Sequence, residues 1–363
     1  MTPIHVSDQP QPRDRATVAH LPQFDDLLDV RTPLEFSHDH IPGACNLPVL
    51  SNDERVQVGT LFKQVSPFAA RKVGAALVAA NIARHLEGPL RDKPRGWRPL
   101  VYCWRGGQRS RALTHVLREI GWDARQLEGG YKAYRHAVVA DTPALAQRLQ
   151  WRVICGMTGS GKSRLLQTLA ELGAQVLDLE ALAMHRGSVL GGLPGAPQPS
   201  QKMFESRVWH QLRALDPARP VYVESESRKI GALQVPQGLI ECMWQSSCVV
   251  VRTAMAARGE LLKQEYVHFL RDPAALAGQL ARLVPLHGRA VIERWNALGH
   301  SGRWDELVED LLVRHYDPTY GRSIDAHYPR LPHAQVLELA SAEQDAFLAA
   351  ARSLLGAVPT PIA

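Results

Sequence analysis

An eight-residue segment near the middle of the chain has the residue types of a phosphate-binding loop. Residues 156–163 read Gly-Met-Thr-Gly-Ser-Gly-Lys-Ser and fit the pattern G-x-x-x-x-G-K-[ST] at every fixed position. The glycines let consecutive backbone N–H groups point at an anion, and the following helix adds its positive end. Lys162 supplies a point charge to the phosphates, and the Ser163 hydroxyl is a ligand for Mg²⁺. The residues predicted to bind phosphate or diphosphate are Gly156, Thr158, Gly159, Ser160, Gly161, Lys162 and Ser163.

Three acidic residues beyond this loop are candidates for chemistry beside the phosphates. Asp178 and Glu224 each end a segment with the pattern of a buried strand, and Glu226 follows closely. Ligands of parallel α/β sheets bind outside the carboxyl ends of the strands, where such side chains meet. We expect the three to bind Mg²⁺ or to act as an acid or base. The alternative for each is a helix cap or a solvated carboxylate.

A second segment, residues 103–110, has the residue types of a nucleophile held in a loop. It reads Cys-Trp-Arg-Gly-Gly-Gln-Arg-Ser, follows an apolar strand and opens a helix. Backbone N–H groups, the helix N-terminus and two arginines favour the thiolate of Cys103, which is both a nucleophile and a carrier of a transferred atom. The alternative is a buried structural cysteine. The residues predicted to support Cys103 are Trp104, Arg105, Gly106, Gly107, Arg109 and Ser110.

Each of the two loops joins a buried strand to a helix. The strand expected over residues 99–102 delivers the cysteine, and the strand expected over 151–155 leads into the phosphate loop. Strands that alternate with helices indicate an α/β protein with parallel sheets covered on their faces. Residues after 255 are mostly helical by pattern. The predicted division is a lead-in, a first α/β domain and a second α/β domain with a helical C-terminal part, over residues 1–22, 23–140 and 141–363.

The composition is that of a folded protein. The 363 residues are 45% hydrophobic and 21% charged, which excludes long disordered, collagen-like and coiled-coil chains. The five cysteines are an odd number, and the longest nearly apolar run is too short to span a bilayer. We therefore expect a cytoplasmic protein with reduced thiols and no membrane partner. His38 and His40 have no third ligand spaced near them, so no histidine or cysteine metal site is expected.

The charge is mildly basic, with a formal net charge of +6. Residues 1–150 hold 20 Lys and Arg against 15 Asp and Glu, a net charge of +5. This excess suits a polyanion such as RNA, although charge alone favours a solvated surface as the explanation. Trp104 either stacks on a flipped-out base or packs on its loop. A C-terminal loop that mixes aromatic and basic side chains is a candidate tRNA contact or a solvated helix end: Arg314, Tyr316, Tyr320 and Arg322.

The first half of the chain resembles a rhodanese domain, a module that transfers sulfur or selenium. The resemblance is carried by Asp-Val-Arg at 29–31, His-Ile-Pro-Gly-Ala at 40–44 and the Cys103 loop. A rhodanese-like domain fused to a P-loop NTPase-like domain, in this order and with these two loops, resembles the tRNA 2-selenouridine synthase family. Further segments agree with the family: Asp-Leu-Glu at 178–180, His-Arg-Gly-Ser at 185–188, Glu-Ser-Glu-Ser at 224–227 and Tyr-Asp-Pro at 316–318.

The resemblance implies a transferase that replaces sulfur by selenium at C2 of the wobble 2-thiouridine, position U34, of tRNAs such as those for Lys, Glu and Gln. Selenophosphate is the implied selenium donor, and Cys103 falls on the catalytic cysteine that would carry the selenium. The family also makes S-geranyl-2-thiouridine from geranyl diphosphate, as an intermediate. The phosphate loop would bind that diphosphate, and it is also a candidate site for selenophosphate. No tightly bound cofactor is implied, and Mg²⁺ is a candidate.

Two other functions fit parts of the sequence. Cys103 and Arg109 have the C-x-x-x-x-x-R spacing of phosphatases that form a phosphocysteine, some of which share the rhodanese-type fold. Such an enzyme leaves the attached phosphate loop unexplained, and Tyr102 stands where tyrosine phosphatases usually have histidine. A P-loop kinase or switch protein, with the rhodanese-like domain as a docking module, is the other alternative.

Overall fold

The chain folds into two compact units that meet between Asp141 and Thr142. The computed structural model describes residues 14–356, apart from the side chains of residues 322, 323 and 325. The boundary falls within helix α5 (Gly130–Gln147). Over residues 14–356, none of the helices combines the length and the apolar character that a bilayer crossing requires.

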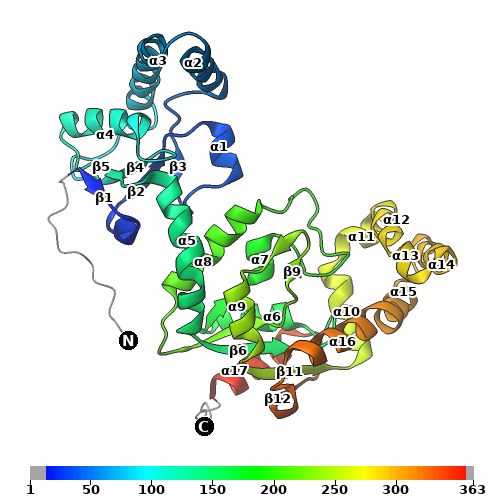
Figure 1. The fold of residues 1–363 in the computed structure, drawn as a ribbon. Helices are drawn as coiled ribbons and strands as arrows, with labels where there is room; N and C mark the ends of the chain where they lie inside the picture. Colours follow the sequence, from blue (N-terminus) through cyan, green and yellow to red (C-terminus); the bar gives the residue numbers. More distant parts are fainter. Residues whose placement is uncertain (1–13, 357–363) are drawn as a thin grey trace. The chain divides into compact units, whose positions relative to one another are not determined.

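The first unit is built on a five-stranded parallel sheet with the strand order β1-β5-β4-β2-β3 (Figure 1). Its central strand β4 is buried along its whole length, as expected of a parallel sheet covered on its faces. The strands are Arg15–Ala16 (β1), Asp26–Asp29 (β2), Cys45–Asn46 (β3), Pro99–Tyr102 (β4) and Arg125–Leu127 (β5). The lead-in expected over residues 1–22 therefore contains a strand of the sheet. This strand, β1, joins the sheet through backbone pairing with β5. The sequence of β1 contains no run of apolar residues that would have indicated a strand.

From residue 14 onward, five α-helices and one 3₁₀ helix accompany this sheet. They are η1 (Val18–Gln23), α1 (Pro33–His38), α2 (Asn52–Gln64), α3 (Pro67–Glu87), α4 (Gln108–Ile120) and α5. Helix α4, which follows the cysteine loop, buries one face and packs Leu113 and Leu117 into the cluster around Val101 of β4. It ends where Gly121 takes a left-handed conformation with φ of +109°. The packing of this face holds the helix, and the cysteine loop before it, against the sheet.

The second unit has its own five-stranded parallel sheet, with the order β12-β11-β6-β8-β7. A short antiparallel pair, β9 with β10, lies outside it. The strands are Gln150–Cys155 (β6), Gln175–Leu177 (β7), Pro220–Glu224 (β8), Lys229–Ile230 (β9), Leu233–Gln234 (β10), Ser247–Thr253 (β11) and Gln335–Leu339 (β12). The predicted α/β class with two parallel sheets is confirmed.

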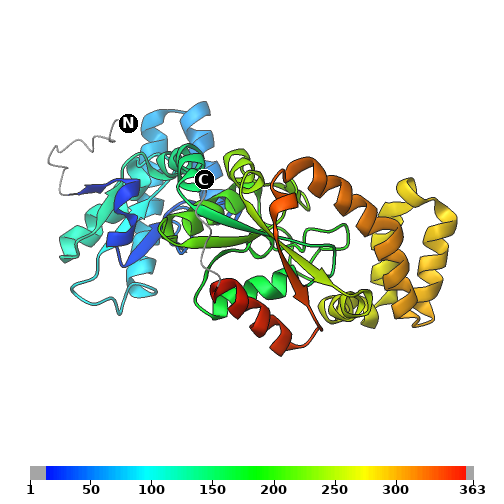
Figure 2. The same cartoon turned by 90° about the horizontal axis from the view of Figure 1, so that it is seen from below.

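Helices that pack near the sheet of this unit are α6 (Lys162–Glu171), α7 (Leu179–Ala183), α8 (Gln201–Ala214), α9 (Gln237–Trp244) and α17 (Gln344–Gly356). The other helices gather at one side of the sheet as a helical lobe, residues 255–327 (Figures 1 and 2). The lobe consists of α10 (Met255–Glu265), α11 (Val267–Arg271), α12 (Pro273–Leu280), η2 (Ala281–Leu283), α13 (Val284–His287), α14 (Arg289–His300), α15 (Trp304–Leu311), η3 (Leu312–Tyr316) and α16 (Asp317–His327). It has an apolar core of its own around Trp295 and Leu307.

One expectation for the C-terminal part is wrong. The segment 316–320, expected as a loop, is helical, because η3 runs directly into α16. Pro318 lies just after the π-helical turn η3, where the regular hydrogen-bond spacing of the helix is already interrupted. The expectation that the part after residue 255 is mostly helical is confirmed, and within it β12 follows η4 (Leu331–His333) and pairs with β11.

Candidate functional site

Cys103 follows β4 directly and lies almost fully buried at the start of its loop. The backbone N–H of Gly107 donates a hydrogen bond to the Cys103 sulfur at 3.3 Å. The hydroxyl oxygen of Ser110, in the first turn of α4, lies 3.1 Å from the same sulfur. Gln126 of β5 donates to that hydroxyl at 2.7 Å, so the Ser110 proton can go either to the sulfur or to the Gly107 carbonyl, which lies 3.3 Å away. A negative charge on sulfur or on an attached selenium thus meets the Gly107 N–H, and the Ser110 hydroxyl can turn its proton to the same charge as a second donor.

Two glycines let the Cys103 loop lie directly against the turn that follows β5. Gly106 and Gly130 have φ of +64° and +58°, a region that side chains disfavour. A Cβ on Gly130 would come 2.3 Å from the carbonyl oxygen of Cys103 and 2.4 Å from the Gly106 nitrogen. The N–H of Tyr131 donates to the Cys103 carbonyl at 2.8 Å. The loop is therefore held by backbone contacts that no larger residue at these positions would permit.

The two arginines of the loop differ in their surroundings. Arg109 forms an ion pair with Glu35, at 2.8 Å between its Nη1 and the carboxylate. Burial alone would raise the pKa of Glu35, but the hydrogen bonds and the charge of Arg109 outweigh it and leave that pKa below its usual value. Arg105 is exposed. The expectation that both charges serve the cysteine therefore needs revision, because Glu35 engages Arg109.

A buried ion pair beneath the loop anchors its surroundings. Arg31 contacts Asp29 at 2.6 Å and donates to the backbone carbonyl of Asp39 at 2.7 Å. Its guanidinium carbon lies 3.9 Å from the centre of the Tyr131 ring. Removing one partner of such a pair leaves a buried charge uncompensated, which typically costs about 3–5 kcal/mol. The Asp-Val-Arg segment of the sequence therefore has a structural role behind the cysteine loop.

Trp104, next to the cysteine, is 39% exposed. Its ring lies 5.2 Å from the Tyr131 ring, centre to centre. The side chain thus packs on a neighbour and still presents part of its surface to solvent, which keeps both predicted roles open.

The phosphate loop of the second unit has the expected strand–loop–helix setting. It leaves β6 at Cys155 and enters α6 at Lys162. Gly159 and Gly161 have φ of +75° and +85°, and a Cβ on Gly161 would come 2.8 Å from the ring of Phe347. The Nζ of Lys162 donates to the loop carbonyl of Gly156 at 2.8 Å. The lysine thus already lies over the loop where a phosphate would bind.

Two further observations mark the inside of this loop. The Ser160 hydroxyl is buried and has no hydrogen-bond partner among the described residues. The N–H of Gly156 donates to the Tyr320 hydroxyl at 2.7 Å, and Lys162 lies 5.4 Å from the centre of the same ring. Tyr320 therefore joins α16 to the phosphate loop, a link between residues far apart in the sequence.

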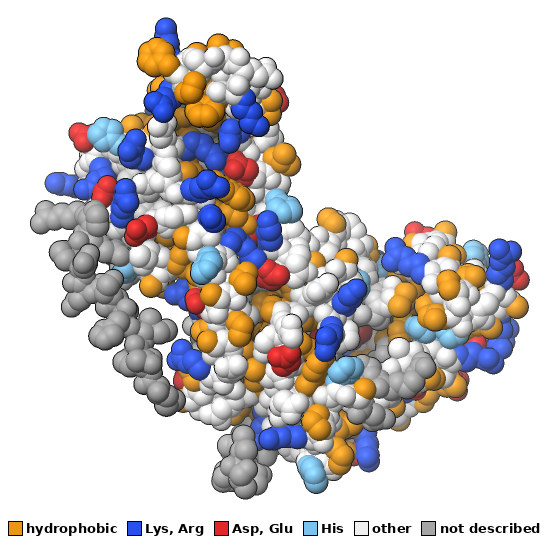
Figure 3. Space-filling model, in the orientation of Figure 1, with side chains coloured by type: hydrophobic (Ala, Val, Ile, Leu, Met, Phe, Trp, Pro, Cys, Tyr) orange, Lys and Arg blue, Asp and Glu red, His pale blue; other side chains and the backbone are white. Residues whose placement is uncertain are grey.

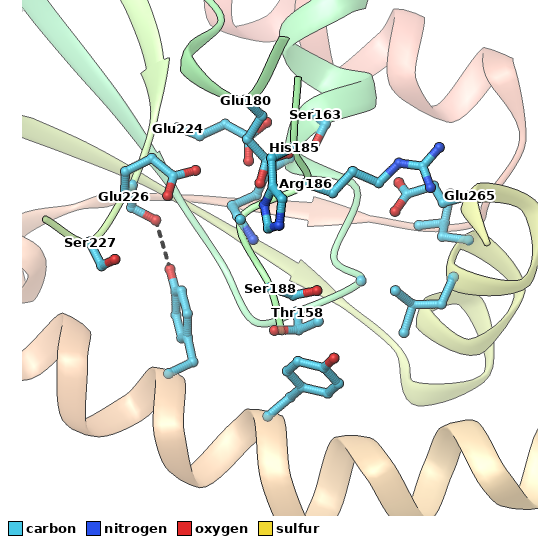
Figure 4. A pocket seen from close by; sticks show the side chains of 18 of the residues that line it. Thr158, Ser163, Glu180, His185, Arg186, Ser188, Glu224, Glu226, Ser227 and Glu265 are labelled. Atoms are coloured by element: carbon cyan, nitrogen blue, oxygen red, sulfur yellow. Dashed lines mark hydrogen bonds between the residues drawn. The ribbon is translucent and has the colours of Figure 1, made fainter. Parts of the chain in front are cut away.

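Three carboxylates lie together beside the loop, and one of them, Glu180, was not among the predicted residues. Glu180, Glu224 and Glu226 offer oxygen atoms that all lie within 4.8 Å of one another (Figure 4). One oxygen of Glu224, at the end of β8, is buried without a hydrogen-bond partner in the described part of the chain. Asp178 instead caps helix α7, where it accepts from the Ala181 N–H at 2.8 Å. Asp178 is therefore a helix cap, which was the alternative to its predicted role. Glu180 occupies the position in the carboxylate cluster that was expected for Asp178.

The electrostatics of this cluster are unusual for carboxylates. Burial raises the pKa of Glu224 to about 7, although Lys162 and Ser163 oppose the rise. Burial and the charge of Glu224 raise the pKa of Glu226 to about 8. Burial, followed by the charges of Glu224 and Glu226, also raises the pKa of Glu180 well above its usual value. A divalent cation would relieve this repulsion, so the residues fit Mg²⁺.

These shifts predict a pH dependence of stability. Unfolded carboxylates ionise near pH 4.5, whereas Glu224 and Glu226 in the folded protein hold their protons to about pH 7 and 8. The folded state therefore binds more protons over this range, and stability falls as the pH rises from about 5 to about 8. Glu226 is partly exposed to the cavity, so its shift is discounted for solvent screening. We expect its ionisation to lower the free energy of unfolding by about 2–3 kcal/mol over this pH range.

The measurement is the melting temperature of metal-free protein between pH 5 and pH 9. Glu226→Gln, which cannot ionise, should melt higher than the wild type at pH 8–9 and flatten the profile. Glu171→Gln, on the exposed end of α6, is the matched control and should follow the wild type. A wild-type profile that rises from pH 5 to pH 8, with no effect of Glu226→Gln, would contradict the assignment.

A cavity of about 880 Å³ opens in front of the phosphate loop. The loop and the carboxylates supply polar groups, as Figure 4 shows for Ser163, Glu224 and Glu226. The lobe and the loop after α7 supply aromatic and aliphatic side chains: Val189, Leu262, Tyr266, Leu286, Tyr316 and Tyr320. The cavity therefore suits a ligand that has both a phosphate group and an apolar part.

An apolar crevice of about 60 Å³ adjoins this cavity within the helical lobe. The two share Thr158, Leu262, Tyr266 and Tyr316 among their lining residues. The other residues of the crevice are almost all apolar: Leu190, Phe269, Leu270, Leu276, Trp304, Leu307, Val308, Leu311 and Leu312, with Lys263 at its edge.

Three of the four candidates for tRNA contact have described side chains, and these three do not form one surface. Tyr316 and Tyr320 line the cavity of the phosphate loop, and burial raises the pKa of Tyr316 to about 12. Arg314 is exposed and pairs with Asp310 at 2.7 Å. The side chain of Arg322 lies outside the described part. Sequence reasoning missed Glu180, Arg186 and Tyr266 as cavity residues, and only their place in family-like segments or a helix could have drawn attention to them.

Two family models match this chain. Residues 16–137 match the rhodanese-like domain, and residues 149–283 match the tRNA 2-selenouridine synthase AAA domain. The chain is 36% identical over 263 residues to the tRNA 2-selenouridine synthase of Nitrosomonas europaea, covering 71% of this chain and 67% of the relative. For the synthase of Aeromonas salmonicida the identity is 35% over 324 residues, with 81% and 86% covered. For that of Salmonella newport it is 39% over 328 residues, with 81% and 87% covered. Matches of this identity and extent place the chain in the tRNA 2-selenouridine synthase family.

Proposed function

We propose that this enzyme replaces the C2 sulfur of the wobble 2-thiouridine (U34) of tRNA with selenium from selenophosphate, through S-geranyl-2-thiouridine made from geranyl diphosphate. The observation that carries the proposal is the pairing, in one chain of this family, of a buried thiol met by two donors with a phosphate loop that opens into a partly apolar cavity. As an enzyme of tRNA it would act in the cytoplasm, on tRNAs such as those for Lys, Glu and Gln.

The first step is an alkylation at the phosphate loop. The sulfur of 2-thiouridine attacks C1 of the geranyl group, the C–O bond to the diphosphate breaks, and N3 loses its proton. The leaving diphosphate gains charge, which Lys162 and the N–H groups at the start of α6 are placed to stabilise. The step is useful because a thiocarbonyl sulfur leaves poorly, whereas an alkylated sulfur departs as geranylthiol.

The second step is the exchange at the rhodanese-like domain. Selenium carried on the Cys103 sulfur as a selenopersulfide adds to C2 of the base, the C2–S bond breaks, and geranylthiolate leaves. The geranylthiolate then attacks the Cys103 sulfur, so that the S–Se bond breaks, its electron pair stays with the selenium on C2, and a mixed disulfide at Cys103 remains for a cellular thiol to reduce. The Gly107 N–H and the Ser110 hydroxyl stabilise the negative charge on the carried chalcogen. This role needs a thiol and its donors, and it makes no demand on Arg109, which Glu35 engages.

The phosphatase alternative is weaker for the same reason. A phosphocysteine enzyme needs its arginine free to grip the phosphate in the cysteine loop. Here both terminal nitrogens of Arg109 donate to Glu35, at 2.8 and 3.3 Å. A phosphatase reaction would first have to break this pair.

The tRNA is expected to contact the first unit beside the cysteine. Figure 3 shows Lys and Arg side chains spread over the visible face of this unit, in keeping with the net charge of +5 over residues 1–150. Arg105 and Trp104 are exposed next to Cys103 and suit a phosphate and a base, respectively. Mg²⁺ belongs to the proposal as well: Glu180, Glu224, Glu226 and Ser163 would hold it, and it would supply positive charge beside the diphosphate.

The apolar crevice gives a prediction about the length of the prenyl chain. If the far end of the prenyl chain enters the crevice, a larger side chain in the crevice should lower the transfer rate of longer prenyl donors more than that of shorter ones. Leu276→Phe, at the crevice wall, should lower geranyl transfer relative to dimethylallyl transfer by about tenfold. Rates of both transfers to thiolated tRNA, measured with the two diphosphates, give the ratio.

Leu298→Phe is the matched control for this ratio. Leu298 belongs to the same apolar core of the lobe but is not part of the crevice wall. It should lower both rates together or neither. An unchanged ratio in Leu276→Phe, or the same change in both variants, would show that the crevice does not discriminate between prenyl chains of different length.

The function as a whole is tested by mass analysis of tRNA nucleosides. Cells that lack this protein should contain neither 2-selenouridine nor geranylated 2-thiouridine at the wobble position, and a restored copy should return both. Unchanged amounts of both nucleosides in the deleted strain would refute the proposed function.

A further inference from the structure

The His-Arg-Gly-Ser segment at 185–188 follows α7 and forms a tight turn over the carboxylate cluster. Gly187 has φ of +65°, and a Cβ there would come 2.5 Å from a carboxylate oxygen of Glu180. The Arg186 N–H donates to the Gly191 carbonyl at 2.8 Å, and the Ser188 hydroxyl lies 3.2 Å from that of Tyr266. These contacts fix the direction in which the side chain of Arg186 leaves the turn.

Arg186 lines the cavity of the phosphate loop together with two other cationic side chains, Lys162 and Arg164. Its guanidinium carbon lies 5.0 Å from the centre of the Tyr266 ring, and the side chain lines the cavity near Glu265 (Figure 4). Its Nη1 is buried and has no hydrogen-bond partner among residues 14–356. A buried guanidinium N–H without a partner is costly, so its presence points to a ligand that supplies the acceptor.

Neighbouring groups do not account for this nitrogen. Glu265 is close enough for the charge of Arg186 to act on it, yet burial raises the pKa of Glu265. The other arginine of the cavity, Arg164, is already engaged by Gln264, Gln344 and the Ala342 carbonyl at 3.0–3.3 Å. Arg186 thus differs from Arg164 in offering donors that the fold leaves unused.

We propose that Arg186 binds the second phosphate of a diphosphate whose other phosphate lies in the loop at Lys162. The planar guanidinium offers paired donors that match phosphate oxygens, and the ring of Tyr266 holds its plane. A monophosphate would need only the loop, whereas a diphosphate would need the loop and Arg186. The identity of the prenyl group on that diphosphate rests on the proposed function; the diphosphate contact itself does not.

The test compares diphosphate with monophosphate binding in the same proteins. Titration calorimetry in buffer with Mg²⁺ gives affinities for geranyl diphosphate, geranyl monophosphate, inorganic pyrophosphate and inorganic phosphate. Arg186→Ala should weaken both diphosphates by about 10–100-fold and change the monophosphates by less than about twofold. Arg186→Lys keeps the positive charge but loses the paired donors of the guanidinium. Its affinity for the diphosphates should lie between those of the wild type and Arg186→Ala.

Arg303→Ala is the control, because Arg303 is 58% exposed and pairs with Glu306 at the start of α15. Equal weakening of mono- and diphosphates in Arg186→Ala would assign Arg186 a structural role and overturn the proposal, as would an unchanged diphosphate affinity or a wild type that binds no diphosphate. Arg186-dependent binding of pyrophosphate without any geranyl transfer would leave the inference standing and refute the proposed function. Melting curves of the variants report folding separately.

Discussion

Lys162→Ala should abolish geranyl transfer to thiolated tRNA, with a loss of at least about 100-fold in rate. Lys162 is the one loop side chain that brings a full positive charge to the bound diphosphate. Its Nζ lies at the mouth of the loop, 2.8 Å from the Gly156 carbonyl and 3.2 Å from that of Met157. Without it, the charge that develops on the leaving diphosphate is opposed by the nearby carboxylates of Glu224 and Glu226. The rate of S-geranyl-2-thiouridine formation, followed by mass analysis of digested tRNA, is the measurement.

Lys229→Ala is the matched control for Lys162→Ala. Lys229 is exposed on the short strand β9 and takes no part in the lining of the cavity. That variant should prenylate at the wild-type rate. If Lys162→Ala is folded by its melting curve and still transfers geranyl at the wild-type rate, the diphosphate does not bind in the phosphate loop.

Cys103→Ser should stop selenouridine formation, by more than about 1,000-fold, and leave geranyl transfer intact. Serine keeps the size of the side chain and its neighbours Gly107 and Ser110, but its oxygen cannot carry selenium in place of sulfur. S-geranyl-2-thiouridine should therefore accumulate. The ratio of the geranylated to the selenated nucleoside in a complete reaction with both donors reports the block directly.

Cys45→Ser serves as the control in the same unit, because Cys45 is an exposed free thiol on β3. It should give both nucleosides in wild-type proportion. Wild-type amounts of selenouridine from Cys103→Ser would show that the buried thiol is not the selenium carrier.

Local sequence was enough to foresee how each loop is positioned. The glycines and the Lys-Ser pair of the phosphate loop are contiguous, and the strand and helix around them were readable from their own residues. The same holds for the cysteine loop, which leaves a fully apolar strand and opens an amphipathic helix. In both cases the residues that set the backbone are the residues that do the chemistry.

The wall of the cavity was not foreseeable, because it depends on contacts between distant segments. Tyr320 reaches Gly156 across 164 residues, and Glu35 engages Arg109 across 74. The sequence around Pro318 predicts a loop because proline usually interrupts a helix, whereas here the helix continues past it through a π-helical turn. Glu180 lies two residues after the carboxylate that was chosen, and only the capping role of Asp178 shows which of them faces the cluster.

The central claim is that one chain carries two chemically distinct sites that act on the same base in a fixed order. It is tested most directly by passing thiolated tRNA through two variants in succession. Treatment with Cys103→Ser and geranyl diphosphate, recovery of the tRNA, and then treatment with Lys162→Ala and selenophosphate should yield 2-selenouridine. The reverse order should yield none. Selenouridine in both orders, or in neither, would contradict the claim.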